Sequence, residues 1–480
     1  MFKIVDGDTM GLEDVDAFID LVNDLPDQLT VFFDRTEDIF VARAPGRLDV
    51  MGGIADYSGS LVLPMPIAEA TFAAVQKCED PSIEIVSLGS DEGSLRFLMS
   101  EFDLGLGARG YDNVRNWFGG KDHWASYIAG ALFALHHELG LEFSHGLRIL
   151  IHSSIPIGKG VSSSAAVEVS TMQAVCAAVD IKIEPLELAM LCQLVENKIV
   201  GAACGIMDQI AVHCGVENSL VSLVCQPALM NDPLPIADGL ELWGIDSGIS
   251  HAVIGSDYSS VRAGAFMGYR IIADLAGLKT QVVRDGIVTI EDGRWKGYLS
   301  NVTPDEYDRE FAEQIPESLT GHEFLENYGG TTDTVAAIDP ERRYPVKAPT
   351  EHGIYENHRV IQFARLLARP IDDTSLQILG ELMFASHSGY VSCRLNERQT
   401  DLIVEMVRQK KGEGIFGARV TGGGGGGTVA LLARSGSQAA VESLAVEYES
   451  LTGRKPYIFR GSSPGCSKFG NLRLRHSGKE

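Results

Sequence analysis

The 480-residue chain is 45% hydrophobic and 22% charged, the balance of a folded protein long enough for two or more domains. Its 65 acidic residues outnumber its 40 basic residues, so the formal net charge at pH 7 is −25. Such a surface repels nucleic acid and anionic membranes, and neither is an expected partner. A bound polyphosphate must therefore be held locally, by backbone N–H groups, a metal ion and a few cations.

The start of the chain lacks a basic segment followed by an apolar one, and no run of eighteen apolar residues occurs. The sequence therefore predicts neither a signal peptide nor a membrane span. Its eight cysteines include no C-x-x-C pair, which favours neither a zinc site nor a secreted disulfide framework. We expect a cytoplasmic protein in which most thiols are small core residues.

Residues 1–39 are acidic and broken by short apolar patches, which predicts a helical extension ahead of the first clear strand. From Phe40 onwards, short apolar runs bounded by glycine and proline favour strands. Apolar residues at every second position of 147–151 predict a largely buried strand. Between residues 165 and 179 the apolar spacing alternates between four and three, which indicates one face of a helix.

The stretch 280–355 is rich in Pro, Asp, Glu and Gly and has weak periodicity, so we expect an insertion or an irregular surface region. Helical spacing resumes at 360–367, and six glycines at 422–427 precede a predicted strand at 428–432. The arginine-rich segment 473–476 is expected to be a solvated end. Helices mixed with hairpin-like strands favour an α+β fold over a parallel α/β sheet.

The most informative segment is a loop of glycines and serines at 156–166, with the sequence Pro-Ile-Gly-Lys-Gly-Val-Ser-Ser-Ser-Ala-Ala. It lies between a predicted strand and a predicted helix. Its glycines can turn backbone N–H groups inward, and a helix start adds unpaired N–H donors and the positive end of the helix dipole. Such a loop can bind a triphosphate without a cluster of cations. A serine N-cap after a tight turn is the alternative.

Three further segments place polar groups among glycines and apolar residues. Residues 44–59 carry one arginine and two aspartates. Asp208 lies in the segment Cys-Gly-Ile-Met-Asp-Gln, where an unpaired carboxylate is costly, so it is either a hydrogen-bonded structural acid or directed at a substrate. The six glycines at 422–427 are entropically expensive to order, and their strand-like flanks favour a close backbone approach to a ligand over a flexible linker.

In this order, the segments resemble the motifs of the GHMP small-molecule kinases and, within them, of the galactokinase branch. The matching stretches are A-P-G-R…D-Y, G-K-G-V-S-S-S-A, C-G-I-M-D-Q and T-G-G-G-G-G-G. The resemblance implies two α+β domains with the active site in the cleft between them. It implies an ATP-binding domain at 40–235 and a C-terminal domain at 236–480, after the extension 1–39.

By that resemblance, seven consecutive residues would wrap the ATP phosphates: Gly158, Lys159, Gly160, Val161, Ser162, Ser163 and Ser164. Ser164 and Glu196 would hold Mg²⁺, the one expected cofactor, through hard oxygen ligands. Asp208 would act on the anomeric hydroxyl of a sugar, either as a base or by orienting it. Arg47 would lie beside Asp208, keep it ionised and offset charge on the phosphoryl group.

The same resemblance implies a set of sugar-binding residues: Asp56, Tyr258, Asp208, Gly53, Ile54, Gly423 and Gly424. Galactokinases usually have Gly-Glu-His-Thr-Asp-Tyr where this chain has Gly-Gly-Ile-Ala-Asp-Tyr at 52–57. Gly53 and Ile54 thus replace two sugar-contacting residues, and the pocket loses an acceptor for the hydroxymethyl end of a hexose. Leaving that hydroxyl buried and unpaired would cost about 1–3 kcal/mol.

L-Arabinopyranose matches galactose at C1 to C4 and lacks the C6 group, and the segments 52–63 and 461–470 also resemble the kinase part of plant L-arabinokinases. The sequence therefore favours an ATP-dependent sugar 1-kinase for L-arabinose, as a monomer or weak dimer. A galactokinase, or a kinase for another aldose or a uronic acid, would need partners such as Arg262, His251 or Arg419. A non-catalytic sugar sensor is a further alternative, although the phosphate loop and the catalytic acid are intact.

Overall fold

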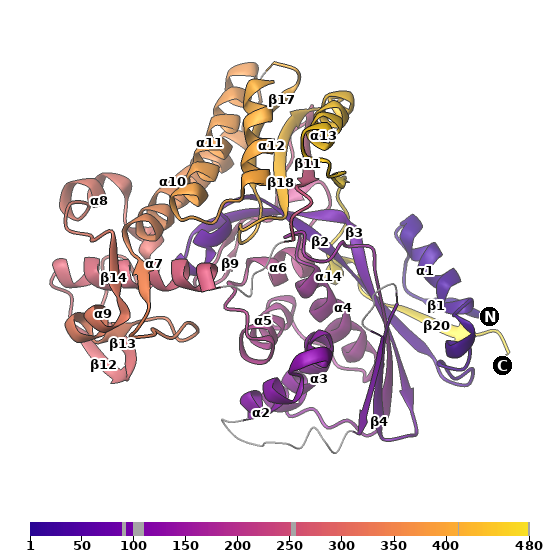
Figure 1. The fold of residues 1–480 in the computed structure, drawn as a ribbon. Helices are drawn as coiled ribbons and strands as arrows, with labels where there is room; N and C mark the ends of the chain where they lie inside the picture. The colour runs from indigo at the N-terminus through magenta and orange to yellow at the C-terminus, as the bar shows by residue number, and fades with distance from the viewer. Residues whose placement is uncertain (89–92, 99–109, 251–255, 411, 479–480) are drawn as a thin grey trace.

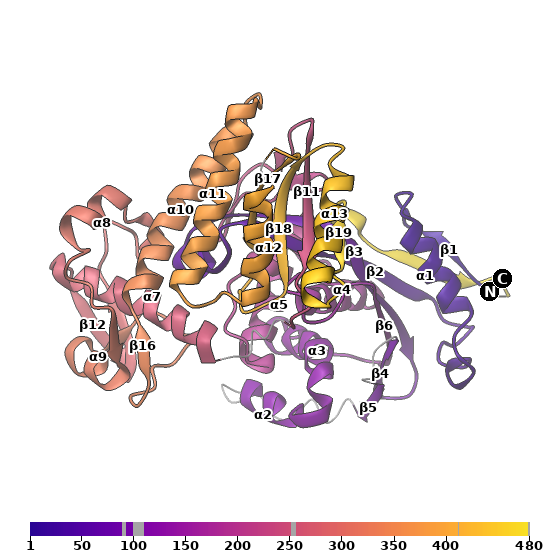
Figure 2. The same ribbon diagram turned by 45° about the horizontal axis from the view of Figure 1, so that its top comes forward.

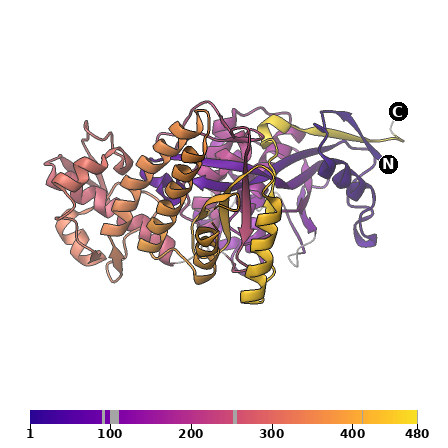
Figure 3. The same ribbon diagram turned by 90° about the horizontal axis from the view of Figure 1, so that it is seen from above.

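The computed structural model describes residues 1–88, 93–98, 110–250, 256–410 and 412–478. A large twisted sheet with helices on both faces occupies the centre, a smaller helix-covered sheet lies against it, and a lobe of short elements lies at one side (Figure 1). The two chain ends lie together at the opposite side from that lobe (Figure 2, Figure 3), where the N-terminal amine is 3.0 Å from His476 Nε2.

The α-helices are α1 (Glu13–Asn23), α2 (Gly110–Trp117), α3 (Ser126–Leu139), α4 (Ser163–Ala178), α5 (Pro185–Val195), α6 (Met207–Cys214), α7 (Ser256–Leu275), α8 (Pro304–Glu310), α9 (Gly321–Tyr328), α10 (Lys347–Leu367), α11 (Asp373–Ser392), α12 (Arg398–Gln409), α13 (Gln438–Thr452) and α14 (Cys466–Phe469). Shorter helical turns are η1 (Asp27–Leu29), η2 (Gly53–Ser58), η4 (Gly120–Ala125), the π-turn η5 (Glu196–Val200) and η6 (Leu299–Asn301).

The large sheet has the order β1 (Phe2–Asp6), β20 (Leu472–His476), β2 (Ile39–Met51), β3 (Leu61–Cys78), β6 (Gly146–Ser153), β4 (Ser82–Leu88) and β5 (Ser94–Leu98), and β3 also pairs with β8 (Leu223–Val224), which pairs with β9 (Leu229–Met230). The second sheet has the order β17 (Ile415–Val420), β18 (Thr428–Arg434), β11 (Leu240–Asp246) and β19 (Ile458–Arg460). Short strands are β7 (Ser219–Leu220) with β10 (Leu234–Pro235), β12 (Thr280–Arg284) with β13 (Gly286–Ile290) and β15 (Gly330–Thr331), and β14 (Ser318–Thr320) with β16 (Arg343–Pro345).

Both faces of the large sheet are buried. Ile149 and Ile151 of β6 pack toward α3, α4 and α5 on one face. Leu150 packs on the other face with Phe72 and with Phe18 of α1. The strand predicted at 147–151 is therefore confirmed, and so is the helix predicted from residue 165, which is α4. The loop between β6 and α4 is therefore held at both ends, by a strand inside the large sheet and by a helix that packs on β2 and β3.

The C-terminal segment contradicts its sequence-based interpretation. Residues 473–476 are not a solvated end, since β20 pairs antiparallel with both β1 and β2. Leu472 and Leu474 are fully buried, and the arginines alternate with them. That Leu-Arg-Leu-Arg alternation is the two-residue period of a strand with one buried face. Residues 1–39 contain the expected helix, α1, and also the strand β1 that pairs with β20.

The region 280–355 is more ordered than its composition suggested. It forms β12 to β16, α8, α9 and the start of α10, and its description as an irregular surface region is wrong. Trp295, Tyr307 and Phe324 are almost fully buried and pack with α7 in a separate apolar cluster. Whether this lobe is an insertion stays a prediction.

The second sheet is antiparallel and is covered by α11, α12 and α13. The helix predicted at 360–367 lies in α10, and the strand predicted at 428–432 is β18. The glycines at 422–427 form the hairpin loop between β17 and β18, so they are not a linker between domains. The α+β class is confirmed, while the boundaries 39/40 and 235/236 stay predictions. Across the described ranges, no helix is both long and apolar enough to cross a membrane. All eight cysteines are free thiols.

Candidate active site

The loop between β6 and α4 has its backbone carbonyls tied to the protein. Thr428 Oγ1 donates to the carbonyl of Lys159 at 2.8 Å. Arg47 donates from Nη1 to the carbonyl of Gly160 at 2.6 Å and from its backbone N to that of Val161 at 3.0 Å. In a trans peptide the N–H points opposite to the C=O, so the three N–H groups that follow these carbonyls point away from these partners. An anion-binding loop needs its peptide groups turned in this direction, with carbonyls held by the protein and N–H groups pointing away from it.

Ser162 precedes the first turn of α4 but does not cap it. Its φ is +61°, in the left-handed region, and its side chain makes no capping hydrogen bond. The residue is buried, and within the described part of the chain its Oγ has no hydrogen-bond partner. A buried, unpaired hydroxyl in a strained conformation is costly unless a ligand satisfies it. The structure therefore favours the anion-binding interpretation of the loop over the serine N-cap.

Lys159 contacts a carboxylate on the second sheet. Its Nζ lies 2.7 Å from Oδ2 of Asp246, a nearly buried residue at the end of β11. The ion pair and the Thr428 contact together fasten the loop to the second sheet. The predicted role of Lys159 in ATP binding stays a prediction, because its ammonium already has an anionic partner.

Arg47 and Asp208 form a two-pronged ion pair. Nε and Nη2 of Arg47, on β2, donate to Oδ1 and Oδ2 of Asp208, near the start of α6, at 2.9 and 2.8 Å. Burial alone would lower the pKa of Arg47, but the charges of Asp208 and Asp49 outweigh burial and raise it. The Asp208 side chain is 23% exposed, so it can contact a ligand while it stays paired.

Ser164 and Glu196 place two oxygens next to the same loop. Ser164 Oγ donates to Glu196 Oε1 at 2.9 Å, and Gln209 Nε2 donates to Oε2 at 2.6 Å. Burial and the negative charge of Asp208 raise the pKa of Glu196 to about 7, although these hydrogen bonds oppose the shift.

These two oxygens fit the donor chemistry of Mg²⁺, which prefers hard oxygen ligands and takes its remaining ligands from phosphate and water. A bound cation would also offset the charge that Glu196 carries when ionised. Within the described ranges, no group of three or more His, Cys, Asp or Glu side chains could hold a metal ion by itself.

Asp56 lies in η2 and is almost fully buried. Its Oδ1 accepts the backbone N–H of Tyr57 at 2.6 Å. Burial and the charge of Asp208 raise the pKa of Asp56 to about 7, although Arg262 opposes the shift. A side chain at residue 205 could not be accommodated, since a Cβ on Gly205 would lie 1.8 Å from Oδ2 of Asp56.

A single cavity of about 310 Å³ brings most of the predicted site residues together: Arg47, Gly53, Ile54, Asp56, Gly158, Gly160, Ser162, Ser163, Ser164, Glu196, Asp208, Tyr258 and Gly423. Of the other predicted residues, Lys159, Val161 and Gly424 do not line it. Gly424 packs instead against the carbonyl of Leu395, where a Cβ would lie 2.3 Å from the oxygen. The cavity thus joins a phosphate-type loop, a paired carboxylate and an apolar corner.

The two arginines considered as alternative sugar partners are both engaged elsewhere. Arg262 donates to both carboxylate oxygens of Asp333 at 2.7 and 2.8 Å and lines a neighbouring cavity of about 320 Å³. Arg419 is fully buried and pairs with Asp49 at 3.1 Å. His251 lies outside the described residues. Neither arginine lines the cavity that holds Asp208.

Several residues that support the site were missed in the sequence. Thr428 and Asp246 hold the phosphate loop, and Tyr390 and Glu356 hold the backbone at residues 52–54. Thr428 directly follows the glycine motif as the first residue of β18, and the other three residues lie far along the chain from the motifs, in ordinary strands and helices. No local spacing or composition distinguishes them.

The chain matches three family descriptions: the galactokinase galactose-binding signature at residues 30–77, the GHMP kinases N terminal domain at 126–216 and the GHMP kinases C terminal at 364–448. It is 40% identical to L-arabinokinase of Arabidopsis thaliana over 99% of its own length and 52% of the relative, so it spans about half of that protein. It is 31% identical to a galactokinase of Chloroflexus aurantiacus, over 86% of this chain and 89% of the relative. The crystal structure of Lactococcus lactis galactokinase complexed with galactose aligns with a TM-score of 0.70 at 21% identity, over 93% of this chain and 99% of that one.

Proposed function

Because the chain belongs to the GHMP kinase family, in its galactokinase branch, we propose that it is an ATP- and Mg²⁺-dependent sugar 1-kinase for L-arabinose. The observation that carries the proposal is the Arg47–Asp208 ion pair, which lies on the wall of the same cavity as the loop 158–164. A partly exposed carboxylate in the same cavity as a phosphate-type loop is the arrangement needed to bring a hydroxyl to a phosphate.

In this proposal the loop 158–164 binds the ATP phosphates with its backbone N–H groups and the Ser162 hydroxyl. Its carbonyls are held by Arg47 and Thr428, so the loop need not rearrange to present these donors. Mg²⁺, held by Ser164 and Glu196, would neutralise charge on the phosphoryl oxygens. The protein thereby binds a polyanion although its net charge is −25.

Asp208 accepts a hydrogen bond from the anomeric hydroxyl of the sugar. The O1 oxygen attacks the γ-phosphorus, the bond from that phosphorus to the bridging oxygen breaks, and ADP leaves. The hydroxyl proton goes to Asp208 or leaves after the transfer, since phosphoryl transfer depends mainly on positioning and charge. Arg47 holds both carboxylate oxygens of Asp208 and places a fixed positive charge beside the transferred group.

The sugar hydroxyls would be bound by Asp56 and Tyr258, with Gly53, Ile54 and Gly423 around them. Ile54 gives the cavity an apolar corner, which suits a sugar without a hydroxymethyl group at C5. The 40% identity to an L-arabinokinase supports the same choice of sugar. Galactose is the second candidate, because the branch signature and the L. lactis structure both concern galactose binding.

We further propose that the protein acts in the cytoplasm as a monomer or weak dimer, with ATP and a monosaccharide as its ligands. Its eight free thiols fit a reducing compartment.

The test is a coupled ADP-release assay with ATP and Mg²⁺ across L-arabinose, D-galactose, D-galacturonate, D-glucuronate, L-fucose and D-xylose. Selective turnover of L-arabinose supports the proposal. A preference for D-galactose would support the kinase activity but contradict L-arabinose as the substrate. No turnover of any sugar, with ATP still bound, favours a sensor.

A further inference from the structure

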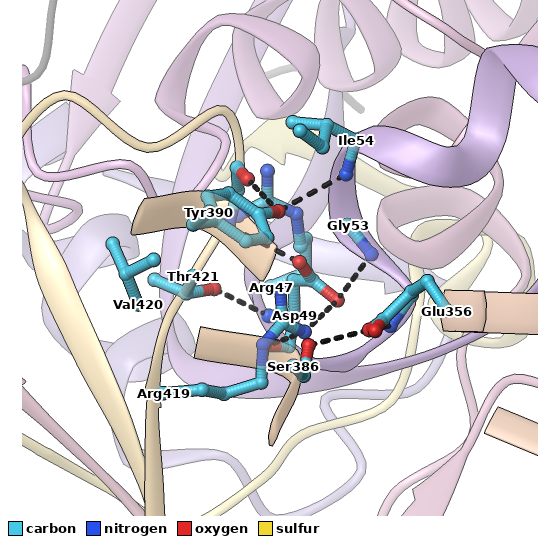
Figure 4. Close-up of polar contacts among 12 residues, drawn as sticks. Arg47, Asp49, Gly53, Ile54, Glu356, Ser386, Tyr390, Arg419, Val420 and Thr421 are labelled. Atoms are coloured by element: carbon cyan, nitrogen blue, oxygen red, sulfur yellow. Dashed lines mark hydrogen bonds and ion pairs between the residues drawn. The ribbon is translucent and has the colours of Figure 1, made fainter. Parts of the chain in front are cut away.

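The backbone that borders the sugar corner of the cavity is held from beneath by three side chains (Figure 4). The N–H of Gly52 donates to Glu356 Oε1 at 3.2 Å, and that of Gly53 to Asp49 Oδ1 at 3.2 Å. The N–H of Ile54 donates to the hydroxyl of Tyr390 at 3.0 Å. Three successive amides are thus bound to buried acceptors, two of which come from α10 and α11.

Gly53 is directed at this buried layer and not at the cavity. Its φ is +49°, and a Cβ built on it would lie 1.8 Å from the Tyr390 hydroxyl, 2.7 Å from Arg419 Nη2 and 2.8 Å from Asp49 Oδ2. Real Cβ atoms do not approach other atoms this closely, so the Tyr390 hydroxyl occupies the space of any side chain at residue 53.

The charges beneath Gly53 are already balanced. Asp49 is fully buried and accepts hydrogen bonds from Arg419 at 3.1 Å and from the backbone N of Gly422 at 3.2 Å. Arg419 lies over the ring of Tyr390, 5.2 Å from its centroid. A carboxylate at residue 53 would add a buried anion beside Asp49 and Glu356, which already pair with Arg419 and Arg359.

Tyr390 also links this backbone to the glycine loop. Its hydroxyl donates to the carbonyl of Gly422 at 2.6 Å while it accepts from the N–H of Ile54. Both Ile54 and Gly422 line the cavity, whereas Tyr390 is fully buried behind them. One hydroxyl group therefore sets the distance between two walls of the sugar corner.

We propose that Tyr390 is a specificity-determining positioning residue: its hydroxyl excludes a side chain at residue 53 and fixes Ile54 against the glycine loop, so residue 53 cannot supply an acceptor for a sugar's C6 hydroxyl. This inference rests on the proposed sugar-kinase function and deepens it. Tyr390 does not touch the sugar and acts through the backbone of Gly53 and Ile54.

The test is a double-mutant cycle with Gly53→Ala and Tyr390→Phe. Alanine at position 53 has the same positive-φ strain in both backgrounds, so the cycle isolates its contact with the hydroxyl. We expect Gly53→Ala to raise KM for L-arabinose by about twentyfold when the tyrosine is present and by about fivefold or less in the Tyr390→Phe background, with KM for ATP unchanged. Tyr390→Phe alone should lower the ratio of kcat/KM for L-arabinose over D-galactose.

Tyr448→Phe is the matched control. Tyr448 is also fully buried, and its hydroxyl donates to a backbone carbonyl, that of Ser247, at 2.6 Å. Tyr448→Phe should lower thermal stability about as much as Tyr390→Phe does. It should leave the ratio of kcat/KM for L-arabinose over D-galactose unchanged. Additive effects of Gly53→Ala and Tyr390→Phe, or the same sugar ratio in both tyrosine variants, would overturn the proposal.

Gly53→Glu provides a second test that does not depend on the folding of Tyr390→Phe. We expect it to lose turnover of L-arabinose without gaining turnover of D-galactose, because its side chain points into the buried layer. A Gly53→Glu variant that prefers D-galactose would overturn the role of Tyr390. The wild-type sugar panel, measured first, tests the proposed function separately.

Discussion

Two loops line the same cavity, and their peptide groups are oriented in opposite ways. At residues 159–161 the carbonyls accept hydrogen bonds from Thr428 and Arg47, and the N–H groups that follow them point away from these partners. At residues 52–54 the N–H groups are bound by buried side chains. The first loop can therefore bind an anion with its backbone, whereas the second must leave hydroxyl recognition to side chains such as Asp56.

Glycines in these two loops serve different purposes. Gly158 and Gly160 allow a chain reversal that exposes donors, and both have positive φ. Gly53 also has positive φ, but there the missing side chain makes room for Tyr390. Composition alone does not distinguish these uses, because the difference depends on which distant residue approaches the backbone.

The largest expected effect concerns the carboxylate between the two loops. Asp208→Asn should reduce kcat by about a thousandfold or more, because the hydroxyl loses its anionic acceptor and Arg47 loses its partner. The measurement is ADP release at saturating ATP and sugar.

Asp333→Asn is the matched control, because Asp333 forms the same two-pronged pair with Arg262 in the neighbouring cavity. Both variants should lose thermal stability, but Asp333→Asn should retain most of kcat. Equal losses of kcat would show that Asp208 is structural only.

One hydrogen bond of the loop 158–164 can be removed without changing residues 52–54. Thr428→Val removes the hydroxyl that holds the Lys159 carbonyl and keeps the volume of the side chain. KM for ATP should rise about fivefold, the value of one hydrogen bond, while KM for the sugar stays the same. Initial-rate kinetics with each substrate varied in turn would check this, and a change in the sugar KM alone would contradict it.

Thr421, at the other end of the glycine loop, allows the matching test at residues 52–54. Thr421 Oγ1 accepts the backbone N–H of Asp49 at 2.7 Å, beneath residues 52–54. Thr421→Val should raise KM for the sugar about threefold and leave KM for ATP unchanged. Thr428→Val should therefore change only KM for ATP, and Thr421→Val only KM for the sugar. If both variants changed the same KM, the two loops would not have separate roles.

A further expected effect is a pH dependence of stability. Burial and Asp208 raise the pKa of Glu196 to about 7, above that of an unfolded chain. Between about pH 4.5 and 7 the folded protein holds the proton that the unfolded chain has lost, so this group lowers the free energy of unfolding as pH rises. Glu196→Gln should make that fall shallower, as measured by urea unfolding at pH 5 and pH 7.5. An unchanged slope would show that Glu196 is already ionised at pH 5.

Much of the fold followed from sequence periodicity. The strand at 147–151 shows a two-residue pattern, the helix from residue 165 shows helical spacing, and the strand at 428–432 is a short apolar run after the glycines; all three are present. The segment 473–476 also shows a two-residue pattern, but its arginines suggested a chain end exposed to solvent. Its pairing partner, β1, lies at the other end of the chain, so no local property could indicate it.

The site was predictable where one motif supplies both the loop and its chemistry. Residues 158–164 and Asp208 stood out because glycines, serines and an acid occur in unusual local settings. Tyr390 and Glu356 did not, since each is one of many polar residues in a long helix. Their importance arises from tertiary contacts across the two sheets.

The most direct test is the identity of the product. The protein would be incubated with ATP, Mg²⁺ and L-arabinose, and phosphorus–proton correlation by NMR would locate the new phosphate. We expect one new phosphomonoester whose phosphorus couples to the anomeric proton, formed by the wild-type chain and not by Asp208→Asn. Phosphate on another carbon, or release of inorganic phosphate alone, would contradict it.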